Sequence, residues 1–146
     1  MNIRGFAIDP NPISFENTMP LIESFHHVSL IVMDTERSLA FYRDLLGLWQ
    51  IATRPNLGYP GAWLQIGSCQ IHLLELPNPD PVIGRPDHGG RDRHLAFRVA
   101  CLEVLRQRLE QAGFAFTLSR SGRRALFCRD PDGNALEFIE DSSELS

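Results

Sequence analysis

RDPDGNALEFIE, residues 129–140, is the stretch that decides the fold. Its first half, Asp130-Pro131-Asp132-Gly133, predicts a hairpin corner, because proline supplies the fixed φ of a type I turn and glycine lets the chain leave that turn. The second half alternates, so Glu137 shares a strand face with Ala135 and Ile139. A carboxylate with such neighbours is costly unless it reaches water at a strand edge or pairs with another group. The rest of the chain must show which of the two applies.

Composition and charge exclude several classes of function. With 146 residues the chain makes about one ordinary domain. Its net charge of -4, without a basic cluster beyond Arg123-Arg124, argues against a nucleic-acid or anionic-membrane surface, so the expected partners are small molecules. No segment approaches the roughly 20 apolar residues that a membrane span needs. Widely spaced Cys69, Cys101 and Cys128 fit reduced thiols in a cytoplasmic protein better than a disulfide framework.

Four segments organise the chain. Residues 1–24 form an arm without a sustained period, which packs either on the domain or on a second subunit. Residues 25–76 and 93–146 form two modules, and the stretch 77–92 connects them with four prolines and three glycines. Each module reads as a strand, a helix and three strands. The predicted strands are 25–34, 49–53, 62–66, 70–75, 93–99, 114–118, 124–128 and 135–139, and the predicted helices are 36–46 and 102–112.

The two modules form an internal repeat. The separation is 67 residues between His27 and His94, 66 between Gly47 and Gly113, and 65 between His72 and Glu137. Both glycines stand where a glycine commonly ends a helix. Two copies of such a unit must bury their sheet faces against each other or wrap a shared cavity.

The repeat brings four polar residues to equivalent positions. His27 and His94 lie on the first strand of each module, and His72 and Glu137 on the last. By strand parity, each faces away from the large aliphatic residues that contact the helix. Nitrogen and oxygen donors that converge in a partly apolar cavity suit a divalent transition metal, which would also be the partner that Glu137 needs. We therefore expect the four to bind one metal ion, although any one histidine alone fits an ordinary hydrogen-bonded or surface residue.

One other residue competes for a place in that set, and two further histidines are expected outside it. Glu75 rivals His72 as the third ligand, but its parity puts it on the wrong face. His26 is expected on the helix-facing side or at the strand end, and His88 in a solvent-exposed connector.

Candidate substrate contacts are Ser29, Arg124 and Phe127. Arg124, next to Arg123, fits a charged hairpin edge better than a group that binds a substrate carboxylate or phosphate, and both interpretations stay open. Phe127 and Trp63 lie in strands predicted to line the cavity, where core packing is favoured over substrate stacking.

Three stretches resemble the vicinal oxygen chelate superfamily: HHVSLIVMDTERSLAFYRDLLGL (26–48), RHLAFRVACLEVLRQRLEQAGF (93–114) and RDPDGNALEF (129–138). This superfamily includes glyoxalase I, methylmalonyl-CoA epimerase, fosfomycin-resistance thiol transferases, bleomycin-binding proteins and extradiol dioxygenases. The resemblance covers residues 25–140. It implies an α+β fold, in which paired βαβββ modules form a curved mixed-sheet cavity, usually completed as a homodimer. The metal positions of the superfamily fall on His27, His72, His94 and Glu137.

The chain departs from the superfamily pattern at two places. Ala100-Cys101 replaces the usual acidic or serine cap of the second helix, so that helix is expected to start frayed or to be capped in another way. The third ligand of glyoxalase I and the epimerase is usually Glu or Gln, whereas here it is His72.

These features predict a glyoxalase-like lyase or isomerase, in which one divalent ion (Fe, Mn, Co, Ni or Zn) polarises a small carbonyl or 2-oxo substrate. Glu137 is the candidate base. An Fe(II) extradiol dioxygenase is the alternative, with His27, His94 and Glu137 as the triad and His72 in space that the chemistry needs. A fosfomycin-type thiol transferase ranks lower, since no arginine follows Glu137. The last alternative is a bleomycin-resistance-type protein that sequesters a ligand.

Overall fold

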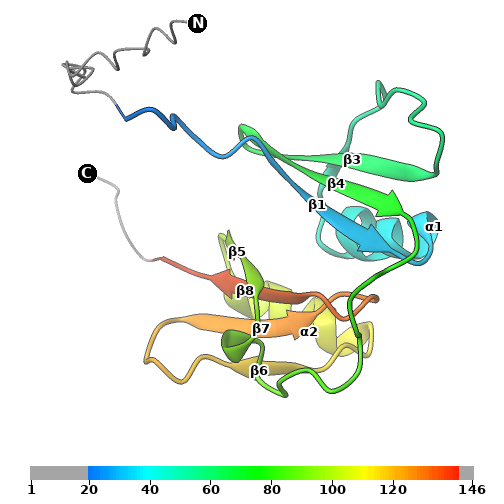
Figure 1. Ribbon diagram of the computed structural model, residues 1–146. Coiled ribbons are helices and arrows are strands. Elements are labelled where there is room, and N and C mark those ends of the chain that lie inside the picture. Colours follow the sequence, from blue (N-terminus) through cyan, green and yellow to red (C-terminus); the bar gives the residue numbers. More distant parts are fainter. Residues whose placement is uncertain (1–19, 142–146) are drawn as a thin grey trace, which may run out of the picture.

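The computed structural model describes residues 20–141, which fold into two βαβββ modules (Figure 1). The predicted α+β fold is thereby confirmed, while residues 1–19 of the predicted arm lie outside the described residues. The first module forms a four-stranded sheet in the order β1-β4-β3-β2. β1 pairs parallel with β4, and the other pairs are antiparallel. Its elements are β1 (His27–Val32), α1 (Thr35–Leu39), η1 (Ala40–Leu45), β2 (Trp49–Gln50), β3 (Gly61–Ile66) and β4 (Cys69–Glu75).

The second module repeats this topology with the strand order β5-β8-β7-β6. β5 pairs parallel with β8, which continues antiparallel into β7 and β6. The predicted hairpin corner at 130–133 joins β7 to β8, as expected. The elements are η2 (Gly89–Arg91), β5 (His94–Arg98), α2 (Leu102–Gln111), β6 (Phe116–Leu118), β7 (Ala125–Arg129) and β8 (Ala135–Ile139).

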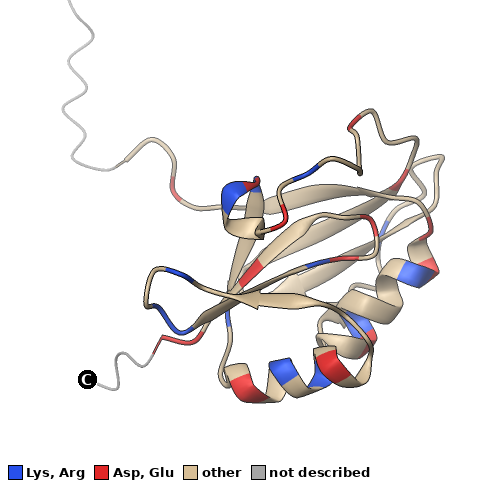
Figure 2. Ribbon diagram, turned by 90° about the horizontal axis from the view of Figure 1, so that it is seen from below, with Lys and Arg blue, Asp and Glu red and all other residues tan. Residues whose placement is uncertain are grey.

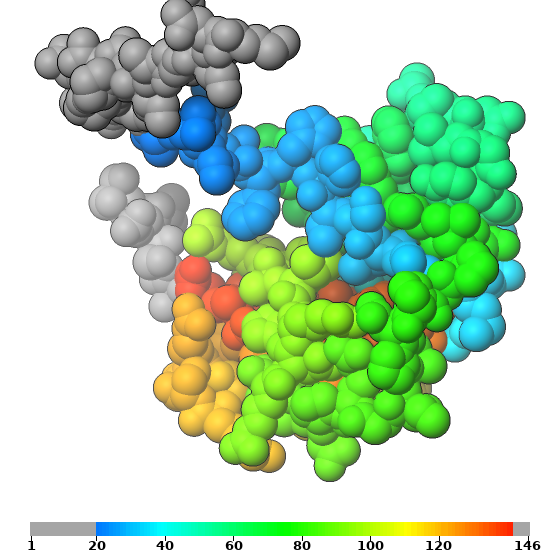
Figure 3. All heavy atoms as spheres, in the orientation of Figure 1, coloured from blue at the N-terminus to red at the C-terminus, as the bar shows by residue number. Residues whose placement is uncertain are grey.

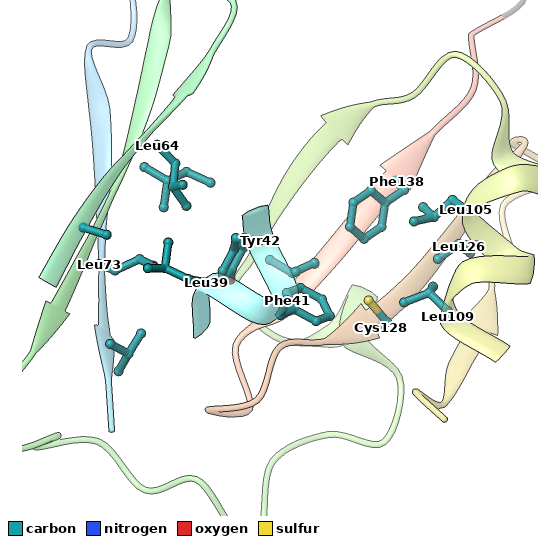
Figure 4. Close-up of a cluster of buried hydrophobic side chains, with 14 residues drawn as sticks. Leu39, Phe41, Tyr42, Leu64, Leu73, Leu105, Leu109, Leu126, Cys128 and Phe138 are labelled. Carbon is teal, nitrogen blue, oxygen red and sulfur yellow. The ribbon is translucent and has the colours of Figure 1, made fainter. Parts of the chain in front are cut away.

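The core lies on the helix side of both sheets. Figure 4 shows it as one cluster that runs from the strands of the first module, past Phe41, to α2 in the second module. Phe41 packs against Phe114, with ring centroids 4.9 Å apart, and so joins the two halves of the cluster. Because these core residues alternate along each strand, the opposite sheet faces carry the candidate ligands, as strand parity predicted. The most deeply buried large side chains are Val32, Leu39, Phe41, Tyr42, Leu64, Leu73, Leu109, Leu126 and Leu136.

Both helices begin against a glutamate at the end of the last strand of their own module: Glu75 is the final residue of β4, and Glu140 directly follows β8. The carboxylate of Glu75 accepts hydrogen bonds from the backbone N–H and the hydroxyl of Thr35, both at 2.8 Å. The carboxylate of Glu140 accepts from the N–H of Leu102 at 2.6 Å. The second helix is therefore capped in another way, because Glu140 takes the place of the missing side-chain cap at Cys101.

The first helix differs from its prediction in its winding. It is α-helical over Thr35–Leu39 and π-helical over Ala40–Leu45, so a segment predicted as one regular helix has two geometries. Gly47 and Gly113 follow the two helices with φ of 79° and 76°, which a side-chain-bearing residue rarely adopts. The predicted strand at 49–53 is shorter than expected, because only Trp49–Gln50 pair with β3.

The turn between β7 and β8 also joins the modules. The hydroxyl of Tyr42 donates to the buried carboxylate of Asp130 at 2.6 Å, and the N–H of Met33 donates to Asp132 at 2.8 Å. Arg37 donates to the carbonyl oxygen of Pro131 at 2.9 Å. Burial raises the pKa of Asp130, and raises that of Tyr42 well above its ordinary value. The stretch that predicts the fold therefore holds α1 and η1 of the other module.

The connector lies against the second module, as Figure 3 shows in green. Asp92 accepts hydrogen bonds from Arg85, at 2.6 and 2.8 Å, and from Arg129, at 2.9 Å. His88 was expected in solvent but is half-buried, because its ring packs on Phe127 and its Nδ1 accepts from the N–H of Gly90. The connector also contains one short helical turn, η2, which its prolines and glycines did not predict.

Among residues 20–141, no helix is long and apolar enough to cross a lipid bilayer. Figure 2 shows acidic and basic residues side by side along the helices, so these faces do not carry charge of one sign.

Candidate metal centre

Three aromatic rings form a stack on the open face of the first sheet. His72 lies between His27 and Trp63, with ring centroids 4.1 and 4.3 Å away and interplanar angles of 15° and 9°. The stack follows from the register, because Trp63 on β3 stands directly opposite His72 on β4, and β1 is the next strand. Strand pairing thus brings the first predicted ligand pair together.

A chain of amide hydrogen bonds fixes the orientation of His72. The amide nitrogen of Gln65 donates to the carbonyl oxygens of Gly67 and Cys69, at 2.7 and 3.1 Å, so its oxygen is left to accept from Gln70 at 3.3 Å. The Gln70 oxygen then lies 2.8 Å from Nε2 of His72. An amide oxygen can only accept, so Nε2 of His72 carries the proton and Nδ1 keeps its lone pair. His72 therefore presents Nδ1 as its free donor atom.

The environment of His72 favours the neutral ring. Its pKa is lowered by burial first, and then by the charges of His27, His26 and Arg54. A histidine binds metal through a neutral ring nitrogen, so a lowered pKa keeps more of it competent near neutral pH. His26 and His27 contact each other through their Nδ1 atoms at 2.8 Å, which leaves Nε2 of His27 as its free ring nitrogen.

The second pair, His94 and Glu137, lies on the open face of the second sheet. Nε2 of His94 is 3.2 Å from a carboxylate oxygen of Glu137, whose side chain is only 9% exposed. Nδ1 of His94 is 2.9 Å from the carbonyl oxygen of Asp92 and must donate to it. If the ring is neutral, Nε2 directs a lone pair toward a carboxylate oxygen. Two lone pairs that face each other repel, so this contact needs a shared cation, either a proton or a metal ion. Glu137 thus has a partner within the chain.

The two pairs do not meet within one chain. Among the residues that the structure describes, no group of three or more His, Cys, Asp or Glu side chains is placed to hold a metal ion. His27 and His94 are both exposed on their sheet faces. Each module therefore presents two donors to the outside, one pair of rings and one imidazole–carboxylate pair.

The three candidate substrate contacts lie in different surroundings. Ser29 is exposed on β1 and lines an open cavity of about 340 Å³ that also includes His94. Arg124 directly precedes β7, and it is paired with Glu140 at 3.0 Å. Phe127 is 7% exposed, because Gly89 and Gly90 of the connector cover it. Its ring meets the ring of His94 edge-on at 5.4 Å, so in this structure it supports a candidate ligand.

Two further residues at the site, Gln70 and Arg54, were not predicted from the sequence. Gln70 shares the parity of His72, and that signal could have identified it as the hydrogen-bond partner. Arg54 lies in the loop before β3, where no periodic pattern indicates a side-chain direction. Glu75 lies outside the site, as its parity predicted, and its carboxylate instead accepts hydrogen bonds at the start of α1.

Comparison with known proteins agrees with this fold. Residues 24–138 match the model of the Glyoxalase/Bleomycin resistance protein/Dioxygenase superfamily. Glutathione transferase FosA of Serratia marcescens is 34% identical over 121 residues, which are 81% of each chain. Glyoxylase I 4 of Arabidopsis thaliana is 30% identical over 122 residues, covering 80% of this chain and 70% of that one.

A solved structure of a glyoxalase family protein from Bacillus anthracis superposes with a TM-score of 0.70 at 25% identity, covering 85% of this chain and 99% of that one. FosX from Listeria monocytogenes, in a complex with Mn(II), shares the fold with a TM-score of 0.66 at 19% identity, covering 84% and 95%. Because the family model spans most of the sequence and the two modules have the paired topology, the chain belongs to the Glyoxalase/Bleomycin resistance protein/Dioxygenase superfamily.

Proposed function

We propose that this chain is a metal-dependent lyase or isomerase of the glyoxalase type, acting on a small carbonyl or 2-oxo compound. The observation that carries the proposal is the contact between His94 and Glu137. An imidazole lone pair and a carboxylate oxygen, held 3.2 Å apart on an open sheet face, have the donor chemistry of a divalent-ion site. Fe, Mn, Co, Ni and Zn all fit nitrogen and oxygen donors of this kind.

The other donors come from a second copy of the chain. A transition-metal site with protein ligands needs at least three of them, and each module offers two. His27 and His72 of one copy would meet His94 and Glu137 of the other, so that a homodimer carries two equivalent sites. The exposure of His27 and His94 on their sheet faces supports this arrangement. Free cysteines throughout the described residues fit a reducing compartment such as the cytoplasm.

Glu137 has the clearest chemical role. A divalent ion bound there would supply Lewis-acid polarisation of the substrate carbonyl. Glu137 would accept the proton from the carbon next to that carbonyl and return it in the isomerised product. Its burial among Phe127 and Ala135 keeps water away from the carboxylate. His94, held by the carbonyl oxygen of Asp92, fixes the direction in which Glu137 points.

A second candidate uses three ligands in place of four. His72 is held between two rings and by Gln70, which suits a positioning residue as well as a ligand. His27, His94 and Glu137 would then form the two-histidine, one-carboxylate set of an Fe(II) dioxygenase, with positions open for substrate and oxygen. Oxygen uptake with a series of catechols separates this candidate from the isomerase.

Metal content tests the proposal. Untagged wild-type protein is expected to hold near-stoichiometric divalent metal by mass spectrometry, and His94→Ala to lose most of it. His88→Ala is the matched control, because His88 lies in the connector next to the second module, where its ring contacts Gly90 and Phe127. Metal retained by His94→Ala would overturn the ligand assignment. No metal in wild type, even after incubation with the divalent series, would favour a ligand-sequestering protein of the bleomycin-resistance type.

A further inference from the structure

Arg54 lies on the same sheet face as the ring stack, although it belongs to the loop between β2 and β3. Its side chain passes close to Gly61: a Cβ built at that glycine would lie 2.2 Å from the carbonyl oxygen of Leu73, and 3.0 and 3.3 Å from Nη2 and Cζ of Arg54. Gly61 and Trp63 share a face of β3, and Trp63 stacks on His72. The charge of Arg54 is one of the causes of the lowered pKa of His72, so the guanidinium lies within electrostatic reach of the ring stack. The absence of a side chain at residue 61 leaves room for this cation.

The guanidinium of Arg54 is only partly satisfied. Nη2 donates to the carbonyl oxygen of Tyr59 at 3.0 Å and Nη1 to that of Pro55 at 3.5 Å, while the guanidinium carbon lies 5.3 Å from the centroid of the Tyr59 ring. Nε is buried and has no hydrogen-bond partner, the one such side-chain nitrogen or oxygen atom in the described part of the chain. A buried donor without an acceptor is costly, so its retention calls for an explanation.

No carboxylate of the described residues pairs with Arg54. By contrast, the half-buried Arg85 and Arg129 share the carboxylate of Asp92. The open face of the first sheet holds rings, amides and a hydroxyl but no acid, since Glu75 turns away to cap α1. Arg54 therefore gives the open face of the first sheet a positive charge, and a carboxylate that pairs with it would have to belong to a ligand.

We propose that Arg54 binds the carboxylate of the substrate, and that the substrate is a small 2-oxo or 2-hydroxy acid whose reactive carbon lies over His72. The proposal rests on the function proposed above for the same site. A planar guanidinium recognises a carboxylate through paired, charge-assisted hydrogen bonds, and a 2-oxo acid is short enough to keep its carbonyl near the ring stack. Arg54 thus selects for an acid over the corresponding neutral ketone.

The test compares pyruvate with pyruvamide, the uncharged amide in which an NH2 group replaces one carboxylate oxygen. Calorimetric titration of wild type is expected to show tighter binding of pyruvate, and Arg54→Gln to weaken pyruvate binding about tenfold or more while the binding of pyruvamide changes little. Arg54→Lys keeps the positive charge but loses the planar, two-pronged guanidinium, so its affinity for pyruvate should lie between those of wild type and Arg54→Gln. Arg43→Gln is the matched control, because it removes an equal charge from the same module at an exposed pair with Asp44.

Two results would overturn the proposal: wild type that binds the two compounds equally, or Arg54→Gln that binds pyruvate as wild type does. Metal content and the melting temperature of each variant are measured in parallel. If the protein holds no metal, the proposed metal-dependent reaction is contradicted. The preference of the metal-free protein for pyruvate still tests the role of Arg54. The two failures are therefore distinguishable.

Discussion

In the first module the residue opposite Trp63 is His72, and in the second the residue opposite Phe127 is Glu137. Both positions lie at the centre of the last strand, on the open sheet face. The first is surrounded by rings, amides and the cation of Arg54, and the second by a histidine with its Nδ1 already committed. The open face of the first sheet thus carries uncharged groups and one cation, whereas the open face of the second sheet carries a carboxylate. The two modules therefore share a topology and differ in the chemistry of single equivalent positions.

The largest expected effect is on turnover, when the equivalent residues Glu137 and His72 are each replaced by glutamine. Glu137→Gln should lower the turnover of a 2-oxo substrate by about a hundredfold or more, because it removes the proton acceptor. His72→Gln, the change at the equivalent position, should cost about tenfold or less, since a glutamine oxygen can still serve as a donor there. Steady-state kinetics with the same metal added to each variant provide the measurement.

Glu103→Gln is the control for the first of these changes, because it neutralises an exposed acid on α2. Equal losses in Glu137→Gln and His72→Gln would show that the two sheet faces do not have separate roles. Full turnover in Glu137→Gln would remove the base assignment.

The next effect concerns stability at the two hairpins. β3 and β4 are joined by Gly67–Ser68 alone, whereas the corner between β7 and β8 also holds the first module. Asp130→Ala would leave the Tyr42 hydroxyl and the N–H groups of Asp132 and Asn134 without their acceptor. We expect a loss of about 3 kcal/mol or more in the free energy of unfolding, against about 0.5 kcal/mol or less for Ser68→Ala. Chemical denaturation of both variants measures the difference. Equal losses would contradict the conclusion that the corner between β7 and β8 also holds the first module.

The smallest effect is expected at the entry to β5. Hydrogen bonds from Arg85 first, and then from Arg129, hold the pKa of Asp92 well below its usual range. Its contribution to stability is therefore fully present above the ordinary carboxyl pKa, about 4, and is lost as the pH falls toward the folded value. The equivalent residue before β1 is the exposed Phe25, which cannot titrate.

Asp92→Asn should accordingly be less stable than wild type at about pH 7, with a smaller difference at about pH 3. Urea unfolding at the two pH values tests this prediction. The same difference at both would mean that the pair contributes packing without electrostatic stabilisation. Phe25→Ala, measured alongside, should show no dependence on pH in this range.

Much of the fold was predictable from the sequence, because its determinants are local. Strand parity correctly predicted the faces of His27, His72, His94 and Glu137, and glycine positions marked both helix ends. The cap of α2 was not predictable, since Glu140 lies 38 residues from the N–H that it accepts from. The π-helical winding of η1 also left no periodic signal that differs from an ordinary helix.

The site was predictable only within each module. Cross-strand neighbours follow from register, so the stacking of His27 on His72 and the contact of His94 with Glu137 were within reach. The separation of the two pairs depends on how Tyr42 and Asp130 dock the modules, which is a tertiary property. Arg54 was missed for a similar reason: a long side chain that folds back from a loop obeys no strand period.

The outward placement of the two donor pairs has a genetic consequence, if the sites form between copies. A chain with a defective His27 and a chain with a defective Glu137 would each be inactive alone. In a mixed dimer, one site would combine both defects, and the other would combine the two intact sheet faces. Two loss-of-function alleles could therefore complement each other in one cell, whereas two alleles with defects on the same sheet face could not.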